Sequence, residues 1–167
     1  EKFKQRCRLL NKWHFDRLTY HSANGTDFTV WLIPQAKWEG GGETTLAGHY
    51  FNPNMPTEEI FTAPMAGKAE GTLVATKPLS YYGEIIDNFS ITFQNGEAVQ
   101  WQAKTGYEAL SKMIESDQGA RRLGEVALVP YDSPISRQNI LYYNTLFDEN
   151  ASCHFALGDG YTNLIQG

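Results

Sequence analysis

The chain has 167 residues, of which 41% are hydrophobic and 20% are charged. This length and composition are ordinary for one globular domain with a buried core. The formal net charge is −5 and the Lys and Arg residues form no basic stripe, which argues against nucleic acid as a partner. No apolar run approaches the roughly 20 residues of a membrane-spanning helix, so no membrane partner is expected.

The cysteine content is low. Cys7 and Cys153 stand far apart in sequence and outside any Cys-x-x-Cys pattern, so the sequence indicates no disulfide framework. We therefore expect a reducing, cytoplasmic compartment. The sequence contains no Gly-x-Ser-x-Gly elbow, and a cysteine directly beside His154 rarely has the geometry of a catalytic nucleophile. Cys153 is interpreted as a packed, inert thiol.

The first predicted elements are a helix and two hairpins. Apolar residues recur at helical spacing over 3–13, which predicts a short amphipathic helix. The segments 15–20 and 28–33 are rich in aromatic and β-branched residues and flank a polar, Gly-containing stretch, so they are predicted to pair. Strict alternation of apolar and polar residues over 89–94 and 99–103, around an Asn-Gly turn, predicts a second hairpin.

A second helix and a buried strand complete the pattern. Thr105 and Glu108 match a capping box, which predicts a helix that ends near Asp117. The apolar run 124–130 has the length of a buried strand, with Glu125 embedded at its start. Together these elements predict an α+β fold with a mixed, largely antiparallel sheet and two or three helices.

A few polar residues stand in otherwise apolar or turn-rich segments. These are Glu58 and Glu59, Glu125, and the pair Glu149 and His154. A buried carboxylate without a partner costs several kcal/mol, and one divalent metal ion satisfies several carboxylates at once. Carboxylate oxygens with one imidazole suit Zn, Co, Mn or Mg better than ions that prefer thiolates.

These residues are also compatible with hypotheses that involve no metal ion. No His-Glu-x-x-His motif occurs, and these glutamates and His154 also fit surface carboxylates with a core histidine. Glu149 and His154, five residues apart, face one ion only if the backbone turns between them. The aromatic content also fits a rival hypothesis, a carbohydrate- or peptide-binding module without catalysis. Its stacking platform would consist of Trp31, Trp38, Tyr50, Tyr81 and Tyr82. A third hypothesis is a purely structural or dimer-forming piece.

Three segments of the sequence can be compared with the motifs of known families. They are Asn-Met-Pro-Thr-Glu-Glu-Ile-Phe-Thr-Ala-Pro at 54–64, Leu-Gly-Glu-Val-Ala-Leu-Val at 123–129, and Asn-Thr-Leu-Phe-Asp-Glu-Asn-Ala-Ser-Cys-His at 144–154. With Gly-Thr-Asp at 25–27 and Trp-Glu-Gly-Gly at 38–41, they resemble, in order, the metal-dependent aminopeptidase family that includes aminopeptidase T, aminopeptidase S and PepS. The resemblance covers essentially the whole chain.

The resemblance implies a set of metal ligands. Glu59 and Glu125 would bind a pair of divalent metal ions, with Glu125 as the bridging ligand. The segment that ends in Cys-His would contribute Glu149 and His154. The type of ion stays open among Zn, Co, Mn and Mg.

The resemblance also implies the reaction. Members hydrolyse the N-terminal peptide bond of peptides with a free N-terminus and are homodimers. Tyr161 matches a tyrosine that the family places at the reaction centre, where it could donate a hydrogen bond to the tetrahedral intermediate. Glu58 is a candidate general base, by analogy with two-metal aminopeptidases of another fold.

The family pattern extends beyond this chain. Its two remaining ligands, a His and an Asp, belong to a segment that should begin after Gly167, and its N-terminal domain should precede the first residue. Residues 1–167 are therefore expected to be one incomplete C-terminal catalytic domain. We expect this piece to be inactive alone.

Overall fold

The computed structural model describes residues 2–160 and 162–165. Its helices are α1 (Lys2–Trp13), α2 (Tyr107–Ile114), α3 (Pro134–Gln138) and α4 (Thr145–Asp148), with the 3-10 helices η1 (Gly119–Arg121), η2 (Glu149–Ala151) and η3 (Thr162–Leu164). Its strands are β1 (Arg17–His21), β2 (Asp27–Leu32), β3 (Glu43–Thr44), β4 (Tyr50–Phe51), β5 (Ile60–Thr62), β6 (Pro64–Val74), β7 (Leu79–Tyr81), β8 (Glu84–Gln94), β9 (Glu97–Thr105), β10 (Leu123–Leu128) and β11 (His154–Leu157).

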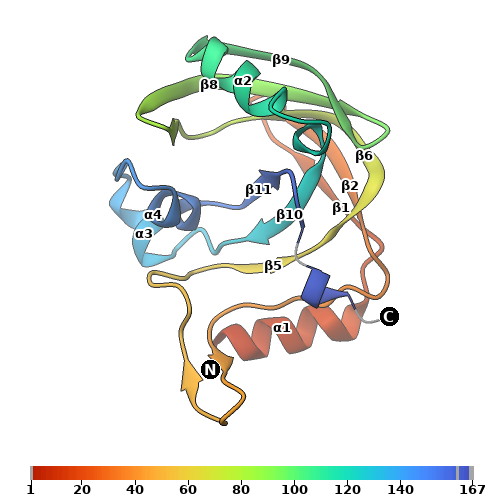
Figure 1. The fold of residues 1–167 in the computed structure, drawn as a ribbon, viewed down its shortest axis with the longest axis vertical. Helices are drawn as coiled ribbons and strands as arrows, with labels where there is room; N and C mark the ends of the chain where they lie inside the picture. Colours follow the sequence, from red (N-terminus) through yellow and green to blue (C-terminus); the bar gives the residue numbers. More distant parts are fainter. Residues whose placement is uncertain (1, 161, 166–167) are drawn as a thin grey trace.

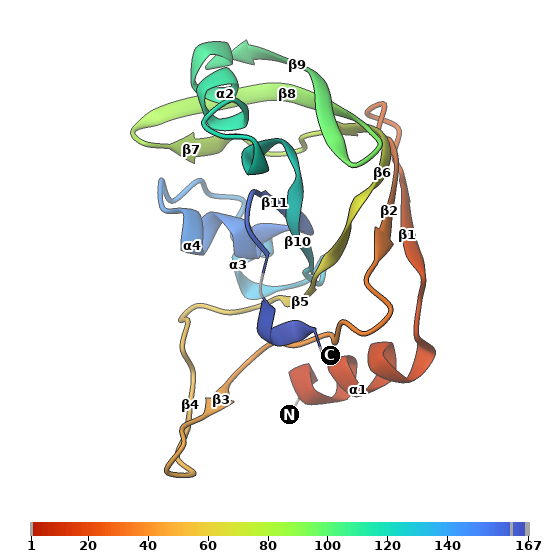
Figure 2. The same cartoon turned by 45° about the vertical axis from the view of Figure 1, so that its right-hand side comes forward.

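A large antiparallel sheet curves around a small one (Figure 1). The large sheet has the order β1-β2-β6-β8-β7, with β9 also paired to β8, and the small sheet has the order β11-β10-β5. In both views, β10 and β11 lie inside the curve, with β8 and β9 above them and β1 and β2 to one side (Figures 1 and 2). The short hairpin β3-β4 extends away from this body (Figure 2). The small sheet is therefore enclosed on several sides.

The core fills the space between the two sheets. Strand β2 alternates so that Phe28, Val30 and Leu32 are buried, as expected for a strand with one face against a core. The ring of Phe28 lies 5.4 Å from the ring of Phe155 in β11 and 5.5 Å from that of Phe93 in β8. Aromatic contacts of this kind join the large sheet to the small one and fix where β11 lies.

Most predicted elements are confirmed. The α+β class, the first helix and both hairpins are present, and α1 packs its apolar residues against the core. The described residues contain four α-helices, of which α3 has five residues and α4 has four, too short to leave a clear periodic signal. The buried strand β10 ends at Leu128 rather than at residue 130. No helix in the described part of the chain is long and apolar enough to cross a membrane.

The predicted capping box is wrong. Thr105 is the last residue of β9 and pairs with Asp87, while the N-cap of α2 is Gly106, which makes no side-chain capping bond. Helix α2 ends at Ile114, short of the predicted Asp117. Gly106 has φ 75°, a left-handed conformation that glycine adopts without a steric cost. The turn from strand to helix therefore depends on this glycine and not on the threonine.

Replacing Gly106 with alanine is expected to lower the free energy of unfolding by about 1–3 kcal/mol. The Cβ atom of the alanine would lie 2.4 Å from the carbonyl oxygen of Ile85, and the alanine would have to adopt the positive φ of Gly106. Gly83 is the matched control, because its φ is 83° but no atom lies within 4 Å of its added Cβ. Urea denaturation should show a smaller loss for Gly83→Ala. Equal losses would mean that the close contact at Gly106 contributes nothing.

Candidate metal centre

The pairing of the small sheet brings together three residues that are far apart in the sequence. Ala127 in the central strand β10 pairs with Phe61 in β5 and with His154 in β11. Residues two apart on a strand share a face, and so do directly paired residues. Glu125 lies two residues before Ala127, and Glu59 lies two residues before Phe61. The three side chains therefore project from the same face of the sheet.

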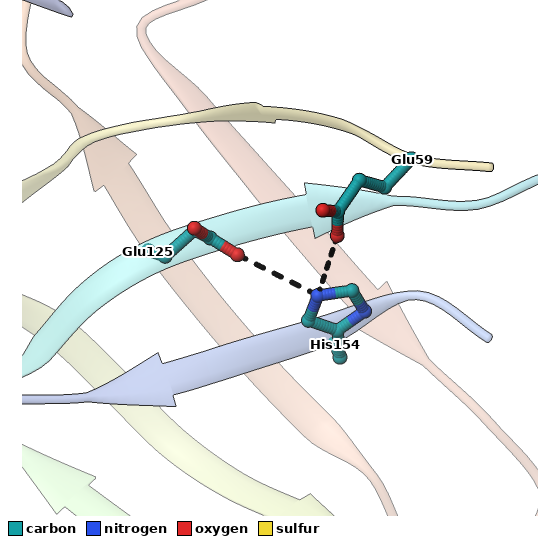
Figure 3. A group of neighbouring side chains, drawn as sticks. All are labelled: Glu59, Glu125 and His154. Atoms are coloured by element: carbon teal, nitrogen blue, oxygen red, sulfur yellow. Dashed lines mark ion pairs between the residues drawn. The ribbon is translucent and has the colours of Figure 1, made fainter. Parts of the chain in front are cut away.

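Their polar atoms meet above that face (Figure 3). His154 Nε2 lies 2.9 Å from Glu59 Oε2 and 3.5 Å from Glu125 Oε1. One ligand atom from each of the three residues lies within 4.8 Å of the other two. The side chains are only 17%, 9% and 11% exposed for His154, Glu59 and Glu125. This is a compact, nearly dry group of two oxygens and one nitrogen.

The contacts within the group are ion pairs of His154 with Glu59 and Glu125 rather than well-aligned hydrogen bonds. Although Glu59 Oε2 and His154 Nε2 are close, neither atom makes a hydrogen bond of acceptable geometry to the residues described. Buried polar atoms without a hydrogen bond are uncommon and cost about 1–3 kcal/mol each. A divalent cation among the three atoms would contact all of them at once in place of these ion pairs, and the mixture of carboxylate and imidazole suits such an ion.

Electrostatics also indicate an excess of buried negative charge. Burial alone would lower the pKa of His154, but the carboxylates of Glu125 and Glu59 and the carbonyl of Ser152 outweigh it and raise the pKa to about 10. Burial and then the charge of Glu59 raise the pKa of Glu149 to about 7, with a smaller contribution from Glu125, while His154 acts in the opposite direction. A positive charge is therefore favoured at this position.

The orientation of the histidine ring is set locally. His154 Nδ1 lies 3.0 Å from the carbonyl oxygen of Ser152. Because a carbonyl oxygen only accepts, Nδ1 carries the proton in this contact, and Nε2 is left as the atom that faces Glu59 and Glu125. A bond of this kind from the second ring nitrogen is the usual support of a metal-ligating histidine.

A fully buried asparagine holds two of the ligand segments together. Asn150 is 0% exposed. Its Oδ1 accepts a hydrogen bond from the backbone N–H of Glu58 at 2.7 Å, and its Nδ2 donates to the carbonyl of Leu146 at 2.8 Å. The side chain thus ties the chain just before Glu59 to the helical turns that lead to His154. Sequence reasoning did not single out Asn150, although its place inside the 144–154 motif is a signal for such a role.

The group opens into a large cavity of about 1020 Å³. Glu59, Glu125, Glu149 and His154 all line it. Much of the remaining wall is apolar and includes Leu73, Leu79, Phe89, Ile91 and Met113. The volume is at the upper end of the range for small-molecule sites. The cavity therefore combines an acidic group with an apolar wall.

Only some of the predicted site residues lie together in the structure. It brings Glu59, Glu125 and His154 together, whereas Glu149 lines the same cavity but is not in the group of atoms within 4.8 Å. Glu58 is half-buried and does not line the cavity. Tyr161 lies outside the described residues.

Two other expectations are corrected. Cys153 is exposed rather than packed, although its Sγ lies 3.5 Å from both the backbone N and O of Val129. Trp38 is buried in the core at 4% exposure, so it cannot belong to an exposed stacking platform. The packing of α1 explains this burial, since Asn11 of that helix holds the backbone N and O of Trp38.

Comparisons with known proteins find a matching family and several relatives. Residues 1–167 match the model of a family described as thermophilic metalloprotease (M29). The chain is 52% identical over 158 residues to aminopeptidase AmpS of Bacillus subtilis and 44% identical over 159 residues to aminopeptidase T of Thermus aquaticus. Each match covers 95% of this chain, but only 38% and 39% of those relatives. The chain thus spans about two fifths of the length of the curated relatives it matches.

Solved structures match in the same way. Wild-type AmpT from Thermus thermophilus superimposes with a TM-score of 0.94 at 41% identity, over 98% of this chain and 41% of that one. A 2,5-dihydroxypyridine dioxygenase from Pseudomonas putida reaches a TM-score of 0.65 at 19% identity, over 100% of this chain and 51% of that one. At that identity the second match shows a shared fold alone.

Proposed function

The chain belongs to the thermophilic metalloprotease family, and from this premise we propose that it carries part of the metal centre of an aminopeptidase. Glu59, Glu125 and His154 would hold a divalent ion. The observation that supports this most directly is the close approach of one ligand atom from each of these three largely buried side chains, all within 4.8 Å of one another. The hydrolase activity of the whole protein is part of the proposal.

The proposed reaction is hydrolysis of the N-terminal peptide bond of a peptide with a free N-terminus. A divalent ion held by Glu59, Glu125 and His154 would supply Lewis acidity, which would polarise a peptide carbonyl and make water more acidic. The chain itself would hold the ligands in a largely buried setting, orient His154 through Ser152 and offer the substrate the adjoining cavity. Desolvation of this kind strengthens every charge interaction inside the site.

Other parts of the proposal rest on the family resemblance. They are a second metal ion that Glu125 would also help to hold, a hydrogen bond that Tyr161 would donate to the developing oxyanion, and a homodimeric assembly. The proposed cytoplasmic location rests on the cysteine pattern. Glu58 is left out as the general base, because it does not line the cavity that contains the ligands.

Calorimetric titration with zinc at pH 7.5 tests the proposal. Because three side chains form the group, the 167-residue chain is expected to bind one ion, which EDTA removes, and to show no turnover of leucine p-nitroanilide by itself. His49→Ala is the control for adventitious binding to an exposed histidine, and it should bind zinc as the parent chain does. Absence of zinc binding, or loss of binding in His49→Ala, would contradict the proposal.

A further inference from the structure

We propose that Gly124 is a positioning residue of the metal centre. It allows the chain at 158–160 to cross directly over β10, and this crossing aims Glu125 at the other two ligands. The inference rests on the proposed function, since it concerns how the same three side chains are brought together. Gly124 stands directly before Glu125 in the Leu-Gly-Glu-Val segment and has no side chain, so it can act only through its backbone.

Strand β10 contains a β-bulge at Gly124. Leu123 pairs with Leu157 and Glu125 pairs with Ala156, so two steps along β10 correspond to one step along β11. Gly124 is therefore the extra residue. A bulge interrupts the regular alternation of side chains along a strand, and bulges beside functional sites re-aim a side chain.

The extra residue separates two side chains that would otherwise lie on one face of the small sheet. Residues two apart in a regular strand share a face, so Leu123 would project on the same side as Glu125. In the structure, Leu123 is buried in the hydrophobic core, whereas Glu125 reaches the group that it forms with Glu59 and His154 (Figure 3). The bulge thus allows β10 to bury a leucine in the core and to present a carboxylate to the metal group two positions later.

The bulge leaves no room for a side chain at position 124. An added Cβ atom would lie 2.1 Å from the carbonyl oxygen of Asp159 and 2.6 Å from that of Gly158. Both oxygens belong to the backbone, so they cannot rotate away as the end of a long side chain can. The backbone N–H of Gly158 also donates a hydrogen bond to the carbonyl oxygen of Arg122 at 2.8 Å, which holds the crossing segment against β10. Close approach of two backbones is a position that only glycine fills without strain.

A shift at the crossing would reach the metal group through both strands. Glu125 directly follows the bulge in β10, and β11 carries His154 three residues before Leu157. The atoms His154 Nε2 and Glu125 Oε1 are 3.5 Å apart. Because a Cβ atom essentially never lies closer than 3.0 Å to another heavy atom, an alanine at 124 would force a shift of roughly 1 Å, whereas a binding site must be held within about 0.5 Å.

Three alanine substitutions grade this contact. Gly124→Ala makes the most severe overlap. Gly160→Ala approaches the same crossing from the opposite side, with its Cβ 2.8 Å from the carbonyl oxygen of Gly124, and it keeps the proposal testable if Gly124→Ala fails to fold. Gly83→Ala is the control, because it strains a φ of 83° but places its Cβ more than 4 Å from every described atom and does not line the cavity. It should lose stability without a change at the site.

Two measurements on the 167-residue chain separate position from stability. Competition with a chromophoric chelator gives the zinc affinity, and the visible d–d absorption of bound cobalt reports the geometry of the ligands. Gly124→Ala should bind zinc about 10- to 100-fold more weakly, as expected when a residue that orients a ligand is lost, and Gly160→Ala should show a smaller loss. The cobalt spectrum at saturation should change in both variants, and Gly83→Ala should keep the affinity and the spectrum of the parent chain.

A purely structural role would give a different result, because the folded, cobalt-loaded variants would then have the spectrum of the parent chain. An unchanged spectrum, together with an unchanged zinc affinity, in Gly160→Ala or in a folded Gly124→Ala would overturn the proposal. Equal losses of affinity in Gly83→Ala would also overturn it, since stability alone would then determine the affinity. Failure of the parent chain to bind zinc would instead overturn the proposed function, and it would be seen before any variant is measured.

Discussion

Replacing Glu125 with glutamine is expected to lower the affinity of the chain for zinc by at least about a hundredfold. Loss of a residue that merely supports a ligand costs 10- to 100-fold, and Glu125 is one of the three residues whose atoms form the group. The glutamine keeps the size of the side chain but removes its charge. Competition with a chromophoric chelator measures the effect. Unchanged affinity would mean that zinc binds elsewhere.

The same substitution should leave the metal-free chain folded. Glu125 is about one tenth exposed and lies close to Glu59 and Glu149, so removing its charge relieves repulsion between buried carboxylates while one contact to His154 is weakened. Urea denaturation in EDTA should therefore show a change of less than about 1 kcal/mol. Glu84→Gln, away from the cavity, is the matched control for both measurements. A large loss of stability would indicate that Glu125 acts mainly in folding.

The fold was predictable where a local pattern determines the structure. The hairpin β8-β9 follows from strict alternation around Asn95 and Gly96, both of which adopt positive φ, as this turn type requires. The helix start was not predictable in the same way. Thr105 has the right spacing for a cap, but its pairing with Asp87 extends β9 by one residue. A long-range pairing thus overrides a local preference that contributes only about 1 kcal/mol.

The grouping of Glu59, Glu125 and His154 was expected from the motifs but not from their spacing. Nothing local relates Glu59, Glu125 and His154, because only the order β11-β10-β5 and its register place them on one face. The 54–64 motif also did not indicate which of its two glutamates faces the cavity. Glu58 and Glu59 are neighbours, yet only Glu59 lines the cavity. Successive residues of an extended chain point to opposite sides, so a shift of one position changes which glutamate lines the site.

The metal-free chain is expected to lose stability as the pH rises. His154 has a pKa raised from 6.5 to about 10 in the folded chain. A group whose pKa is raised by folding contributes stability that is fully present below its unfolded value and is lost as the pH rises through the folded value. The loss should therefore extend from about pH 6.5 to about pH 10. For a side chain that is 17% exposed, it should be on the order of a few kcal/mol.

Glu149 acts in the same direction at lower pH. Its pKa is raised from 4.5 to about 7, so its ionisation also destabilises the folded chain as the pH rises through that range. Urea denaturation in EDTA at pH 6, 7, 8 and 9 should show a steady decline for the parent chain and a weaker one for His154→Gln. A stability that increases over this range would contradict the charge balance described for the group.

The affinity for zinc should change with pH in the opposite direction to the stability of the metal-free chain, because the ion and the proton compete for His154 Nε2. Zinc affinity should increase as the pH rises from 6 to 9, and binding at pH 8 should release about one proton from His154, whose folded pKa is about 10. Titration in buffers of different ionisation enthalpy counts that proton. The two slopes have one origin: the carboxylates that hold the imidazole protonated are the same carboxylates that attract the ion. A chain in which only one of the slopes appears would bind zinc through other residues.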